Sequence, residues 1–151
     1  MTIGTNTVVD FFGTPDDLAS SSAAVADAAF SIASDVAQWT NDDDAEMASI
    51  VLSGTWAVAP DAGGSVALYA RLMNIDGTGD QDIPSANYRH KSLGRFPVKD
   101  VTSAQLTAID IDLPNNYSSQ VYEFYIQNNA GQTISAGWKL VVTPKAPGAH
   151  A

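Results

Sequence analysis

From Gln120 to Lys145 the chain reads QVYEFYIQNNAGQTISAGWKLVVTPK, and this stretch indicates the fold more clearly than any other. In its first part Tyr122, Phe124 and Ile126 alternate with their neighbours, and residues 128–131 then form a turn-like NNAG sequence. The second part carries its apolar residues on one parity: Ile134, Ala136, Trp138, Leu140 and Val142. A period of two is typical of half-buried strands. The stretch therefore predicts an antiparallel hairpin that closes a β-domain.

The same period recurs from Ala28 onward, with Phe30, Ile32 and Val36 on one parity. Residues 65–74 are apolar on both parities, as in a central strand covered on both faces. Residues 93–98 contain Pro97, which predicts an edge strand or a bulge because proline lacks an N–H group. A further run alternates in the same way: Ala48, Ile50, Leu52, Gly54, Trp56 and Val58. We expect an all-β fold, an antiparallel, jelly-roll-like β-sandwich of about seven to eight strands with an N-terminal arm.

We divide the chain into an N-terminal arm (residues 1–27), a sandwich domain (28–145) and a flexible C-terminal tail (146–151). The arm holds four large apolar residues: Val8, Val9, Phe11 and Phe12. Two interpretations stay open, because the phenylalanines either enter the domain as a first strand or dock on a neighbouring molecule. These four residues are our candidate partner contact.

Charge is distributed unevenly along the chain. The net charge is −10, and residues 1–70 contain ten acidic residues and no Lys or Arg. Nucleic-acid binders neutralise phosphates with clustered basic residues, so we expect no direct binding of nucleic acid. The acidic half either provides solubility or faces a basic protein surface.

The sequence lacks signals for export and for membrane insertion. The first basic residue is Arg71, so no charged region precedes an apolar segment, and no apolar run approaches the roughly 18 residues of a membrane span. There is no cysteine, so neither disulfides nor thiolate metal sites are available. We expect a soluble protein made in the cytoplasm and without membrane contact.

No pattern for metal binding or catalysis stands out. Residues 41–46 and 76–82 are rich in aspartate, but neither matches an EF-hand loop, so we interpret both as turns, with calcium as the alternative. His90 and His150 are the two histidines, and no nucleophile elbow accompanies them. We expect no enzyme activity, no catalytic residues, no metal and no cofactor. A basic cluster is interpreted as a solvated loop or a partner contact: Arg89, His90, Lys91 and Arg95.

The three tryptophans bear on carbohydrate binding, since exposed aromatic faces stack on sugars. Trp56 and Trp138 share the parity of apolar neighbours and are predicted in the core. Trp39 stands beside the acidic segment, and we favour a core position for it over outward presentation.

Several segments together resemble a family of small virion structural proteins of tailed bacteriophages, found among head decoration and accessory components. They are residues 39–44, 68–71, 74–77, 82–88, Gly94, 96–98, 122–126, 129–132 and 136–138. The resemblance implies a non-enzymatic protein on the capsid surface of the virion that binds and stabilises the lattice of the major capsid protein. It also implies a small symmetric homo-oligomer, for which we assume a trimer. A tail or baseplate component and a carbohydrate-binding β-sandwich module remain the alternatives.

Overall fold

The structure is a computed structural model that describes residues 8–20, 22–89, 92–114 and 119–149. Within these ranges the chain forms nine strands and one short 3-10 helix, η1 (Ala33–Asp35). The strands are β1 (Val8–Phe12), β2 (Asp16–Ala19), β3 (Gln38–Thr40), β4 (Met47–Gly54), β5 (Ser65–Leu72), β6 (Ser92–Pro97), β7 (Gln105–Asp112), β8 (Val121–Asn129) and β9 (Lys139–Ala149). No helix in the described ranges is long and apolar enough to cross a bilayer.

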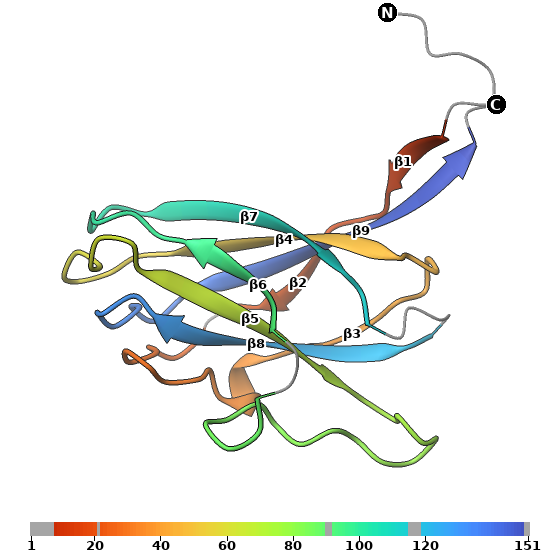
Figure 1. The fold of residues 1–151 in the computed structure, drawn as a ribbon, viewed down its shortest axis with the longest axis horizontal. Helices are drawn as coiled ribbons and strands as arrows, with labels where there is room; N and C mark the ends of the chain where they lie inside the picture. Colours follow the sequence, from red (N-terminus) through yellow and green to blue (C-terminus); the bar gives the residue numbers. More distant parts are fainter. Residues whose placement is uncertain (1–7, 21, 90–91, 115–118, 150–151) are drawn as a thin grey trace, which may run out of the picture.

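The strands form two antiparallel sheets that face each other (Figure 1). One sheet has the order β1-β9-β4-β7, with β2 also paired to β9, and the other has the order β3-β8-β5-β6. Strands β2, β3, β4 and β5 pair with β9, β8, β7 and β6 respectively. Strands early in the chain thus pair in order with strands late in the chain. This is the pairing of one long hairpin that is rolled up into a jelly roll. The expected jelly-roll-like β-sandwich is confirmed, with nine described strands in place of seven to eight.

The core lies between the two sheets and follows from the alternation of the strands. In β4 every second residue is buried, and Ala48, Ile50 and Leu52 point inward. The opposing sheet contributes Tyr122, Phe124 and Ile126 from β8, which are fully buried. Burying a large apolar side chain contributes about 1.5–3 kcal/mol, so these layers account for the cohesion of a chain without disulfides.

The predicted hairpin of residues 120–145 is wrong in its pairing. Strands β8 and β9 lie in different sheets, and Ile134, between them, bridges to Val25 and to Trp56. Residues 122–128 of β8 are buried on both faces, whereas a hairpin strand with one wet side would expose alternate residues. The turn at 128–131 therefore starts a crossing from one sheet to the other.

Residues 28–36 do not form the strand that their period of two predicted. Ala28 has a φ of 61°, and helix η1 interrupts the segment. Phe30 and Val36 instead cover the outer face of the second sheet, where they pack against Tyr69 and its neighbours. This cover confirms that β5 is buried on both faces, and β6 with Pro97 is an edge strand as expected.

The boundaries of the arm and the tail also need correction. Strand β2 pairs with β9, and Leu18 and Val25 are buried in the core, so the sandwich begins well before residue 28. At the other end, residues 146–149 are the last part of β9 and pair with β1. Both corrections have the same physical reason. Backbone N–H and C=O groups need hydrogen-bond partners, and the N-terminal strands β1 and β2 find theirs on β9.

Candidate functional site

The candidate contact residues lie on a two-stranded ribbon made by β1 and the end of β9. Val8 and Val9 lie opposite Ala149 and Gly148, and Phe11 lies opposite Ala146. Figure 1 shows this ribbon extending beyond the body of the sandwich. Phe11 and Phe12 lie on a strand, but their side chains do not enter the domain, so the first of the two interpretations is wrong for these rings. Docking on a neighbouring molecule stays a prediction.

Both phenylalanines of the ribbon are exposed. The exposed fraction is 54% for Phe11 and 65% for Phe12. A two-stranded ribbon has little apolar surface to bury by itself, and it therefore gains little stability from its own packing. Its exposed aromatic residues are thus available to a partner.

Lys145 fixes the base of the ribbon to the sheet. Its Nζ atom lies 5.2 Å from the centre of the Phe12 ring and 2.6 Å from Oδ1 of Asp110 on β7. A cation over an aromatic face is attracted by the ring quadrupole. The hydrogen bond from Lys145 also lowers the pKa of the Asp110 carboxyl group. These contacts orient the ring of Phe12 relative to the sandwich.

The two edges of the ribbon differ in their backbone groups. The Gly13 N–H donates to the Pro144 carbonyl at 2.9 Å, which sets the alternation along β1. Residues 9 and 11 therefore direct their backbone groups toward β9, and residues 8, 10 and 12 direct theirs outward. No described strand pairs with this outer edge of β1. On the other edge, Pro147 lacks an N–H group, so that edge is blunted against a further strand.

A groove of about 220 Å³ lies at the base of the ribbon. Its walls come from three segments distant in sequence: Phe11, Phe12, Gly13, Asp43, Ala45, Pro144 and Ala146. Space there is tight beside Gly13, because a Cβ at this position would lie 2.5 Å from both Asp43 Oδ2 and Pro144 Cγ. The groove thus brings Phe11 and Phe12 of β1 together with Asp43.

The aspartate-rich segments are turns held by their own side chains. Asn41 is buried, and its amide bonds both the N–H and the carbonyl group of Ala45 at 2.9 Å. In the second segment, Asp76 Oδ1 accepts from the Thr78 N–H at 2.9 Å and also from the Gly79 N–H, and these bonds lower the Asp76 pKa. No group of three or more His, Cys, Asp or Glu that could hold a metal ion occurs in the described ranges.

All three tryptophans are buried, so none offers the sugar platform considered for Trp39. Trp39 is 6% exposed, packs against the rings of Tyr122 and Phe124, and donates its Nε1–H to Asp16 at 3.2 Å. The core interpretation of Trp39 is confirmed.

The basic cluster and the histidines are only partly within the described ranges. His90, Lys91 and His150 lie outside them, while Arg89 and Arg95 are exposed. The expectation that His90 takes no part in catalysis therefore stays a prediction.

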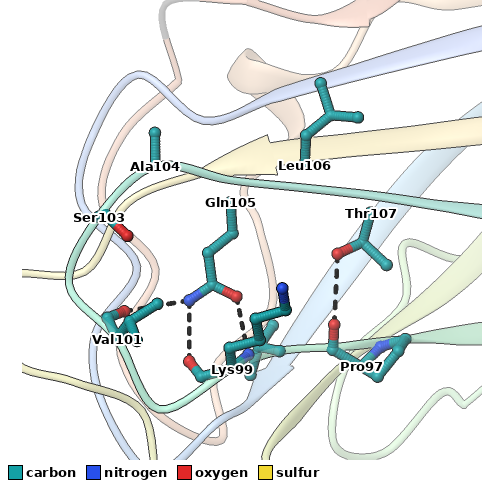
Figure 2. A pocket seen from close by; sticks show the side chains of 9 residues that line it. Pro97, Lys99, Val101, Ser103, Ala104, Gln105, Leu106 and Thr107 are labelled. Carbon is teal, nitrogen blue, oxygen red and sulfur yellow. Dashed lines mark hydrogen bonds between the residues drawn. The ribbon is translucent and has the colours of Figure 1, made fainter.

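A larger hollow of about 560 Å³ lies at the turn between β6 and β7. Figure 2 shows Gln105 pointing toward Lys99 across this turn, with Leu106 on the opposite side of the strand. The Gln105 amide accepts from the Lys99 N–H at 2.7 Å and donates to the Lys99 and Val101 carbonyl groups at 2.8 and 3.1 Å. Its polar groups are thus engaged in shaping the turn, and Leu106 is 75% exposed.

A buried polar network lies on the outer face of the second sheet. Glu123 Oε2 accepts from Arg71 Nη1 at 2.8 Å and from the Tyr125 hydroxyl at 2.9 Å. Arg71 Nε also donates to the Gln81 carbonyl at 2.6 Å, which ties the loop after β5 to this face. Burial, together with the hydrogen bond and charge of Glu123, raises the pKa of Tyr125 to about 12. These hydrogen bonds give Arg71, Glu123 and Tyr125 a structural role.

Sequence reasoning found the phenylalanines of the ribbon but not the groove beside them. It singled out residues 41–46 for their acidic side chains and Phe11 and Phe12 as part of an apolar cluster, and these segments are about 30 positions apart in the chain. Their meeting depends on the register of β1, β9 and β4, which a single sequence does not specify.

Comparisons with known proteins do not assign the chain to a family. No family model matches the sequence, and no curated protein matches it. Among solved structures, the chain is similar to the C-terminal CBM6 of LamC, a marine laminarinase from Zobellia galactanivorans. The match has 11% sequence identity and a TM-score of 0.41, and covers 91% of this chain and 99% of that one. A likeness at this level carries no argument about ligand or activity.

Proposed function

We propose that this protein is a non-enzymatic structural component of a tailed-phage virion, and that it binds and stabilises the capsid lattice by docking its β1–β9 ribbon on the major capsid protein. The observation that carries the proposal is the ribbon itself, which extends from a sandwich with a packed core and holds Phe11 and Phe12 exposed at 54% and 65%. Aromatic anchors dominate the energetics of many protein interfaces, so two such rings on one ribbon suit a docking role.

The expected strength of each contact is modest. Burying one phenylalanine contributes about 1.5–3 kcal/mol before the costs of association are subtracted. Many copies on one shell would nevertheless stabilise it, because anything that binds only the assembled state shifts the equilibrium toward assembly. Oligomers would add avidity, since linked ribbons bind with a raised effective concentration. This role requires adhesion and no chemistry.

Removal of the ribbon strand tests the proposal. Because Leu18 is fully buried, the truncation must stop before β2, and deletion of residues 1–12 meets this condition. We expect the truncated protein to keep a cooperative melt while its affinity for shells of the major capsid protein falls by roughly a hundredfold, equivalent to about 2.7 kcal/mol. Co-sedimentation with shells that lack the protein measures this affinity. Equal binding by the truncated protein would refute the proposal.

A matched pair of substitutions distinguishes specific docking from non-specific hydrophobic adhesion. Phe12→Ser removes an exposed apolar side chain from the ribbon, and Leu106→Ser removes one that is 75% exposed on β7. Only Phe12→Ser should weaken binding to shells. An equal loss for both variants would indicate non-specific adhesion and contradict a dedicated ribbon.

A tail or baseplate position is the alternative that uses the same ribbon. Separation of heads from tails distinguishes the two, since the proposal places the protein in the head fraction. Trp39, the tryptophan considered as a platform for a carbohydrate-binding module, is buried and gives that alternative no support.

A further inference from the structure

We infer that the groove at the base of the ribbon receives a cationic side chain, Lys or Arg, from the protein on which the ribbon docks. The inference rests on the proposed docking function and specifies its chemistry. It starts from the walls of the groove, which Phe11, Phe12 and Asp43 all line. Side chains alternate along β1, so the ring of Phe11 lies on the same face of the strand as the side of Gly13 that the Asp43 carboxylate approaches. A long basic side chain is amphipathic, so its methylene stem can cover aromatic rings while its charged head meets a carboxylate.

The carboxylate of Asp43 is available for such a contact. Within the described ranges, no hydrogen bond or ion pair engages Asp43, whereas Asp110, Asp80 and Glu123 each pair with a basic residue. The exposed neighbours of Asp43 on the same loop, Asp42 and Asp44, add further negative charge beside the groove. A field of one sign attracts and orients partners of the opposite sign.

The chain itself shows how the ring of Phe12 receives a cation. Lys145 Nζ lies 5.2 Å from the centre of this ring while it also bonds a carboxylate, that of Asp110. An aromatic ring and a carboxylate thus already hold one ammonium group at the base of the ribbon. The groove on the other face of β1 offers the same kinds of group in Phe11 and Asp43 and leaves the cation to a partner.

Gly13 keeps the groove in this shape. A Cβ at residue 13 would lie 2.5 Å from Asp43 Oδ2 and from Pro144 Cγ, closer than real Cβ atoms approach. Glycine therefore allows the Asp43 carboxylate and the Pro144 ring to approach the backbone of residue 13 closely. We expect Gly13→Ala to displace Asp43 and to weaken docking even though no charge is lost.

The test compares three aspartates of one loop. Asp43 lines the groove, while Asp42 and Asp44 are exposed beside it and do not. The variants Asp42→Asn, Asp43→Asn and Asp44→Asn each remove one charge, and asparagine tolerates the positive φ of residue 44, which is 51°. The probe is shells assembled from the major capsid protein of the same virion, and affinity is measured by co-sedimentation at several salt concentrations.

Asp43→Asn should weaken binding roughly tenfold and flatten its salt dependence, and the two neighbouring variants should change affinity less than about twofold. Equal effects of all three variants would overturn the inference, because general charge would then explain the attraction. If Phe12→Ser abolishes binding while Asp43→Asn matches its neighbours, the docking function stands and the cationic occupant is wrong. If the unaltered protein does not bind the shells, the proposed function fails and this inference fails with it.

Discussion

Phe12 and Lys145 lie opposite each other in the β1–β9 ribbon, and the Nζ atom of Lys145 lies 5.2 Å from the centre of the Phe12 ring. The same ammonium group bonds Asp110 on β7 at 2.6 Å. Because β1 and β7 are the two edge strands of this sheet, the Lys145 side chain contacts both edges. The ribbon is therefore held in a defined direction at its base.

The variant Lys145→Met should loosen the ribbon without unfolding the sandwich. The pair with Asp110 is partly exposed, so we expect the free energy of unfolding to fall by at most about 1 kcal/mol. Amide hydrogen exchange at Phe11 and Gly13 should become faster, because these amides face β9. Unchanged exchange at both amides would show that Lys145 does not anchor the ribbon.

The contribution of this anchor should also depend on pH. Lys145 lowers the pKa of Asp110 from its ordinary value of 3.8, so the stabilisation is present above that value and is lost as the pH falls through the lowered pKa. The difference in stability between the unaltered protein and Lys145→Met should shrink accordingly below about pH 4.

Leu18 tests whether the sandwich begins before residue 28. Its side chain is fully buried beside β9, so Leu18→Ala should lower the free energy of unfolding by about 2–5 kcal/mol. Chemical denaturation measures the change, and Asp17→Ala, at an exposed neighbouring position, is the control and should change stability by less than about 0.5 kcal/mol. A small effect of Leu18→Ala would restore the interpretation of residues 1–27 as a separate arm.

These outcomes show what the pattern of apolar residues can specify. Ile50 and Leu52 alternate with half-exposed residues in β4, and this local period predicted both the strand and its buried face. The local period does not specify which strand a given strand pairs with. Residues 133–143 would have the same period if they paired with β8, but in the structure their strand pairs with β2 and β4. The sandwich class followed from the sequence, whereas the roll-up and the groove at Asp43 depend on non-local pairing.

Tyr125 should make the stability of the protein fall at alkaline pH. Its pKa is raised from 10.0 to about 12 in the folded state, so the folded protein holds this proton more tightly than the unfolded chain. The contribution is fully present below pH 10.0 and is lost as the pH rises toward about 12. Denaturation measured across this interval should show a steeper decline for the unaltered protein than for Tyr125→Phe. Equal slopes for the two proteins would contradict the buried contact with Glu123.

Trp39 separates a structural role from a sugar-binding one. The side chain is 6% exposed among aromatic rings, so Trp39→Ala should lower the free energy of unfolding by about 3–5 kcal/mol. Loss of glycan binding by this variant would therefore reflect unfolding and would not identify a platform. Glycan binding that is selective in the unaltered protein and survives Phe11→Ser and Phe12→Ser would instead favour a carbohydrate module over ribbon docking.

The most direct measurement of the central claim is an image reconstruction of whole virions with and without this protein. The proposal predicts difference density on the capsid surface, with the end of the sandwich that carries the β1–β9 ribbon turned toward the shell. Density on the tail, or density on the shell whose contact is made by the opposite end at the β6–β7 turn, would contradict the account.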